Sequence, residues 1–93
     1  MISLGAVGCA SNPPEKEYTI AKTALEAARK SESARFAPSE FHHAEESYRK
    51  GEIFFKRGDF GDAKRMFNDS VEYSEQAEDA ARIQRSKTGD DIP

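Results

Sequence analysis

Apolar residues recur at alternating steps of three and four along two neighbouring stretches, 38–57 and about 60–85, which predicts two amphipathic helices. The apolar face of the first stretch consists of Phe41, Ala44, Tyr48, Gly51 and Phe55. Gly58 between the stretches is a typical helix stop, and Asp59 can cap the helix that follows. The pattern therefore predicts a helical hairpin.

The second helix of this hairpin has small residues wherever a facing backbone must come close. Its apolar face consists of Phe60, Ala63, Phe67, Ser70, Ser74, Ala77 and Ala81. We expect Phe55 of the first helix to meet Phe67 across the hairpin. A mid-helix glycine costs roughly 1 kcal/mol relative to alanine, so Gly51 on the apolar face indicates that a neighbouring helix passes too close for a side chain.

A further helix is predicted before the hairpin, from Glu15 to about residue 33. Its core face consists of Tyr18, Ala21, Leu25 and Ala28. Pro38 disfavours a helical conformation at Ala37, so the chain should leave this helix before that position. The expected fold class is all-α, a three-helix antiparallel bundle built on one helical hairpin.

Length and charge limit what this bundle can do. The chain has 93 residues with a net charge of -3, and 33% of them are charged against 37% hydrophobic, which is typical of one small solvated domain. Lys and Arg alternate with Asp and Glu along the same helices, so no basic stripe for a nucleic-acid partner is expected. We expect a tether at 10–14, the helical domain at 15–86 and a disordered tail at 87–93.

The single cysteine, Cys9, lies between an apolar run and a polar segment rich in proline. The order Leu4-Gly5-Ala6-Val7-Gly8-Cys9-Ala10-Ser11-Asn12-Pro13-Pro14 is similar to the lipobox that ends a bacterial lipoprotein signal peptide. Residues 1–9 would then be the end of that signal, with a covalent diacylglycerol and an N-acyl lipid on Cys9. Ala10, where inner-membrane lipoproteins of this kind carry Asp, implies the outer membrane. The competing interpretation of Cys9 is a free thiol in a frayed tail.

The segment before Cys9 is short for a complete secretory signal. Such a signal has a basic start and an apolar run of about 7–15 residues, whereas Met1 is followed by a short apolar run without Lys or Arg. We therefore expect the natural chain to extend upstream of Met1.

No group of residues in the sequence suggests catalysis. His42 and His43 are adjacent, so on a helix they point about 100° apart and cannot chelate one ion together. The carboxylates fall on solvated faces or at helix ends, and there is no G-x-S-x-G, Gly-rich phosphate loop or Cys–His pair. We predict that the chain is not an enzyme and holds no metal and no cofactor beyond the lipid on Cys9.

The hairpin resembles a tetratricopeptide repeat over residues 44–70. The matching positions are Gly51, Phe54, Gly58, Phe60, Ala63 and Phe67. Ser47 and Lys50 replace the large residues expected early in the first helix, and Ser70 replaces the usual second alanine. A single such repeat cannot bury its own faces, so another helix has to cover it.

With its lipobox, its alanine-rich first helix and the Gly58-Asp59-Phe60 turn, the chain as a whole is similar to a family of uncharacterised bacterial envelope lipoproteins. In that family, a tetratricopeptide-like helical domain is often joined to an OmpA-like peptidoglycan-binding domain. The resemblance extends from the lipobox through the helical domain, and no part of this sequence matches the peptidoglycan-binding domain. It implies a lipid-anchored protein on the periplasmic face of the outer membrane that binds another envelope protein or itself. The alternative is a soluble tetratricopeptide-like adaptor or assembly subunit without a lipid anchor.

The candidate partner-binding positions are apolar residues on the flanks of the predicted helices, together with the end of the last helix. They are Ile53, Val71, Ala80, Ile83 and Gln84. The last predicted helix outruns the one before it by about a turn, so its end, around Ala80, Ile83 and Gln84, is expected to lack an intramolecular neighbour. We expect this end to contact a second copy or a partner protein, with a homo-oligomer the favoured outcome.

Overall fold

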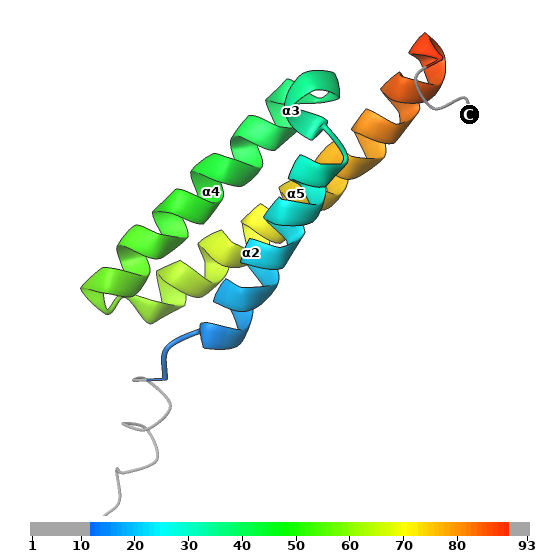
Figure 1. The fold of residues 1–93 in the computed structure, drawn as a ribbon. Coiled ribbons are helices and arrows are strands. Elements are labelled where there is room, and N and C mark those ends of the chain that lie inside the picture. The colour runs from blue at the N-terminus through cyan, green and yellow to red at the C-terminus, as the bar shows by residue number, and fades with distance from the viewer. Residues whose placement is uncertain (1–11, 90–93) are drawn as a thin grey trace, which may run out of the picture.

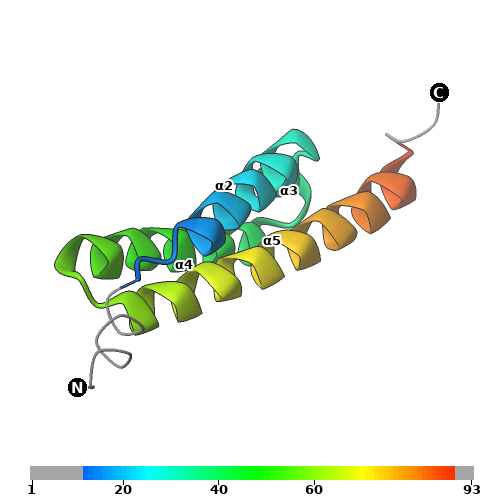
Figure 2. The same cartoon turned by 90° about the horizontal axis from the view of Figure 1, so that it is seen from below.

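The computed structural model describes residues 12–89, and these form an all-helical structure in which four helices pack together. Helix accounts for 88% of this part of the chain, which contains no strand. The helices are α2 (Glu15–Lys30), α3 (Ser33–Phe36), α4 (Pro38–Arg57) and α5 (Phe60–Thr88). Figure 1 shows α2 and α4 lying against the long α5, and Figure 2 shows the end of α5 extending past the other helices.

The predicted hairpin is present as α4 and α5, and the turn between them is built on Gly58. This residue has φ +84°, a left-handed conformation that glycine adopts without the steric cost of a Cβ atom. The Gly58 amide donates to the Phe55 carbonyl at 3.1 Å, and the Asp59 amide donates to the Phe54 carbonyl at 2.9 Å. These two bonds form a Schellman motif, which satisfies the last carbonyls of α4 and sends the chain back along it.

The connection between α2 and α4 differs from the prediction. The helix expected to end near residue 33 ends at Lys30, and a separate one-turn helix, α3, follows. Glu32 between them has φ 63°, a left-handed conformation that non-glycine residues adopt only rarely. Ser33 is buried, and the Ser31 and Ser33 hydroxyl oxygens lie 2.8 Å apart. The weak helical pattern of residues 31–33 does not continue α2, because packing buries Ser33 and holds the chain in a turn.

The C-terminal boundary was also predicted incorrectly. Lys87 and Thr88, expected in a disordered tail, are the last residues of α5, and Gly89 ends the helix with φ 85°. The Thr88 hydroxyl donates to the Arg85 carbonyl at 3.0 Å. A basic residue in the last turn followed by glycine is a favourable helix end, and that signal outweighs the missing apolar period. The rest of the predicted tail, 90–93, lies outside the described residues.

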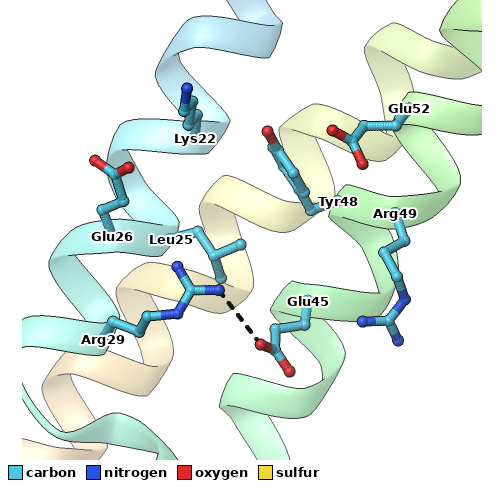
Figure 3. A pocket seen from close by; sticks show the side chains of 8 residues that line it. All are labelled: Lys22, Leu25, Glu26, Arg29, Glu45, Tyr48, Arg49 and Glu52. Carbon is cyan, nitrogen blue, oxygen red and sulfur yellow. Dashed lines mark hydrogen bonds and ion pairs between the residues drawn. The ribbon is translucent and has the colours of Figure 1, made fainter.

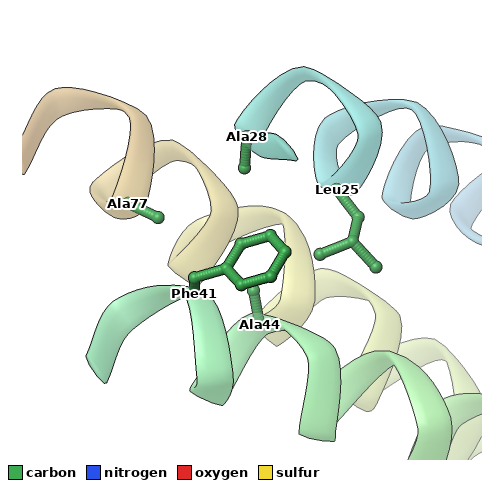
Figure 4. Packing of buried hydrophobic residues seen from close by; sticks show 5 residues of the cluster. All are labelled: Leu25, Ala28, Phe41, Ala44 and Ala77. Atoms are coloured by element: carbon green, nitrogen blue, oxygen red, sulfur yellow. The ribbon is translucent and has the colours of Figure 1, made fainter. Parts of the chain in front are cut away.

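The core consists of two clusters along the line where α2 and α4 meet α5. In one, shown in Figure 4, the Phe41 ring lies among Leu25 and Ala28 of α2, Ala44 of α4 and Ala77 of α5. The second cluster is aromatic and is centred on Phe67, which is fully buried. The ring centroids of Phe55 and Phe67 lie 6.3 Å apart, so the predicted contact across the hairpin is confirmed.

Candidate protein-interaction groove

A groove runs between α2 and α4, because these two helices both pack on α5 but touch each other only sparsely. It contains two hollows, one of about 330 Å³ lined by Tyr18, Glu52, Phe55 and Lys56, and a neighbouring one of about 290 Å³. The second hollow is lined by Lys22, Leu25, Glu26, Arg29, Glu45, Tyr48, Arg49 and Glu52. Glu52 lines both hollows, so they adjoin, and we call them together the α2–α4 groove.

The floor of the α2–α4 groove is aromatic and packed from beneath. Tyr18 stacks on Tyr48 with ring centroids 6.0 Å apart, and it meets Phe55 at 5.9 Å. Below them, the buried Phe67 lies 5.4 Å from Tyr18 and 5.9 Å from Tyr48. Such ring contacts fix the side chains in place, so the floor presents a preformed apolar surface to a partner.

The rim of the groove is charged on both sides. Figure 3 shows Lys22, Glu26 and Arg29 on α2, where Arg29 reaches toward α4, and Glu45, Arg49 and Glu52 on α4. The Arg29 guanidinium lies 3.5 Å from the Glu45 carboxylate and bridges the two helices. The Arg29 side chain is 53% exposed, so the pair contributes little to stability. An apolar floor inside a polar rim is the usual anatomy of a protein-binding surface.

Tyr48 connects the floor to the rim. Its side chain projects from α4 into the groove, as Figure 3 shows. Burial raises the pKa of the Tyr48 phenol above its ordinary value, and interactions with Tyr18 and Glu52 raise it further. A tyrosine phenol is neutral at physiological pH even without this shift, so Tyr48 can share a hydrogen bond with a partner without carrying charge.

The predicted partner-binding residues do not form a single site. Ile53 on α4 is 53% exposed and Ile83 on α5 is 56% exposed, which fits their predicted positions on the helix flanks. Gln84 is exposed, whereas Ala80 is only half-exposed. Val71 is half-buried and packs against the aromatic cluster around Phe67, so it is mainly a core residue.

The expectation that the end of α5 has no intramolecular neighbour is wrong for one of its faces. Ala81 is completely buried, and the Arg85 guanidinium donates to the Ser31 carbonyl at 2.9 Å. The connection between α2 and α3 thus covers that face. The face that carries Ile83 remains exposed, so only this side of the helix end fits the prediction.

The histidines lie on the surface, as the sequence suggests. His42 and His43 are both exposed, and the His43 ring stacks on Tyr73 of α5 with centroids 5.0 Å apart. Within residues 12–89, no three His, Cys, Asp or Glu side chains lie close enough to hold a metal ion. No helix in this part of the chain is both long and apolar enough to cross a membrane. Cys9 lies outside the described residues.

The sequence did not indicate the α2–α4 groove or the exposed Ile20 on α2. It correctly assigned Tyr18, Leu25, Tyr48 and Phe55 to apolar faces, but helical periodicity does not say how far apart two faces lie. The sequence does place a charged residue one turn after each tyrosine, Lys22 after Tyr18 and Glu52 after Tyr48. Charged residues are typical of the rim of a binding surface.

No protein-family model, curated protein or solved structure matches this chain.

Proposed function

We propose that this chain is a non-enzymatic interaction or assembly module of the bacterial envelope, anchored to the periplasmic face of the outer membrane through lipid on Cys9. The observation that carries the binding role is the α2–α4 groove, whose apolar floor is preformed and lies within a charged rim. The anchor rests on the lipobox-like sequence that ends at Cys9.

We also propose a specific architecture for the helical domain. We regard α2, α4 and α5 as a three-helix antiparallel bundle built on one tetratricopeptide-like hairpin, with α3 as a turn inside the connection. Gly51 supports this description, because the position where a repeat has glycine lies directly against the Phe67 ring. In this arrangement α2 covers the hairpin, which a single repeat needs for stability.

The binding role is tested with photoreactive side chains at two lysines of α4, in the natural protein in its own cells. Lys56 lines the larger hollow, whereas Lys50 is exposed on the same helix and lines neither hollow. A partner in the groove should be crosslinked from position 56 and much less from position 50. Equal capture at both positions, or none at 56, would contradict the role of the groove.

The lipid anchor distinguishes this proposal from the alternative, a soluble tetratricopeptide-like adaptor or assembly subunit without lipid. The natural gene product and its Cys9→Ser variant should be compared by fractionation of the envelope. We expect the parent in the outer-membrane fraction and the variant released from it. A parent that fractionates with the soluble proteins would favour the adaptor.

A further inference from the structure

The end of α5 carries an exposed face that the described part of the chain leaves uncovered. Ile83 is 56% exposed, the Asp79 side chain one turn before it is 68% exposed, and Lys87 one turn after it is exposed. With 29 residues against 20 in α4, α5 is longer by roughly 14 Å at about 1.5 Å per residue. Figure 2 shows this extension. Since Ala81 and Arg85 face the bundle, the face of Ile83 points into solvent.

We propose that this face pairs with the same face of a second copy, in antiparallel orientation about a two-fold axis at Ile83. The inference rests on the proposed role as an interaction module and names one of its partners. Positions 79 and 87 lie four residues on either side of Ile83, about 40° from it around the helix. The two-fold axis therefore brings Asp79 of each copy opposite Lys87 of the other, while the two Ile83 side chains meet at the centre.

The charges select this orientation over the parallel one. Antiparallel pairing brings each Asp79 to the level of Lys87 of the other copy, so two symmetric contacts between opposite charges can form. Parallel pairing would put Lys87 against Lys87 and Asp79 against Asp79, which is unfavourable. The ion pair between Asp79 and Arg82 within each helix is exposed, so Asp79 can accept Lys87 at little cost.

The pair is weak because only one helix end of each copy takes part. Stable complexes bury about 1,200–2,000 Å², more than two helix ends of this length can supply. In the pair, Ala80 of one copy lies level with Ser86 of the other, and these small side chains allow the two helices to approach closely. Dissociation in the high micromolar range is therefore expected, and anchoring on a common surface would raise the effective concentration of the two copies.

The test is sedimentation equilibrium on the 93-residue chain with Cys9→Ser, which excludes a disulfide-linked dimer, up to millimolar concentration. The parent should form a concentration-dependent dimer, and Ile83→Glu should abolish it. Ile53→Glu is the matched control, because Ile53 has nearly the same exposure on α4 and should leave the dimer unchanged. Circular dichroism melts establish that each variant is folded.

The ion pairs are tested by charge reversal. Asp79→Lys and Lys87→Glu should each weaken the dimer by roughly tenfold, because each reversal changes two symmetric contacts. The two reversals together should restore dimerisation. A chain that is monomeric throughout, a dimer that tolerates Ile83→Glu, or a double reversal as weak as the single ones would overturn the proposal. None of these results changes crosslinking from Lys56, so failure of self-pairing is distinguishable from failure of the proposed function.

Discussion

Gly51 of α4 lies against the ring of Phe67 of α5 so closely that no side chain fits between them. A Cβ atom at position 51 would stand 2.6 Å from both Cδ1 and Cε1 of that ring. The ring cannot retreat, because it is fully buried and packed against Tyr18, Tyr48 and Phe55. This contact sets the spacing of the α4–α5 hairpin.

Gly51→Leu should therefore destabilise the protein although leucine is the better helix former. The gain in helix propensity is about 1 kcal/mol, whereas overpacking a core typically costs about 1–3 kcal/mol and a whole leucine exceeds the space available. Gly61→Ala is the matched control, since nothing lies within 4 Å of a Cβ atom there and it should stabilise α5. Urea unfolding of both variants measures the difference, and a Gly51→Leu variant more stable than the parent would refute the close approach.

Phe67→Ala should cost about 3–5 kcal/mol, because it removes the ring on which the aromatic cluster is centred. A loss of this size is comparable with the whole stability of so small a domain. Glu72→Ala, at an exposed position of the same helix, should change the stability by less than about 0.5 kcal/mol. Thermal melts followed by circular dichroism compare the two, and coinciding melts would show that the aromatic cluster is not the core.

Two buried serines of α5 should respond differently to substitution by alanine. The Ser70 hydroxyl donates to the Ala44 carbonyl of α4 at 2.8 Å, so Ser70→Ala should cost about 1 kcal/mol. The Ser74 hydroxyl oxygen is buried without a hydrogen-bond partner among residues 12–89, so Ser74→Ala should be neutral or stabilising. Urea unfolding gives both values, and equal losses would mean that Ser74 has a partner.

The folded protein should lose stability in alkali partly through Tyr48. Burial raises the pKa of this phenol, so between the unfolded pKa of about 10 and the higher folded one the native state binds more protons than the unfolded state. The contribution of the neutral Tyr48 phenol to the free energy of unfolding is present in full below about pH 10 and is lost as the pH rises further. Between about pH 9 and pH 11, the free energy of unfolding of Tyr48→Phe should fall less steeply than that of the parent. Parallel curves would show that Tyr48 is not responsible.

The sequence predicts best what depends on helical period and worst what depends on how helices meet. The hairpin, the contact of Phe55 with Phe67 and the close approach at Gly51 follow from residues three or four apart on one face. The break at Glu32 does not, because a left-handed glutamate is stable only where surrounding packing holds it.

The site was less predictable than the fold. The α2–α4 groove exists because α2 and α4 both favour α5 over each other, which is a property of three surfaces at once. The exposed face at Ile83 could be anticipated from helix length. The contact of Arg85 with Ser31 could not, because it joins positions 54 residues apart.

The intact mass of the natural, full-length gene product, purified from the membranes of its own cells, decides whether the protein is anchored by lipid. We expect a chain that begins at Cys9 and carries a diacylglycerol and an N-acyl chain. The Cys9→Ser variant, which cannot accept the lipid, is the control and should retain everything upstream of position 9. An unmodified chain in the parent, with its upstream residues intact, would contradict the lipid anchor.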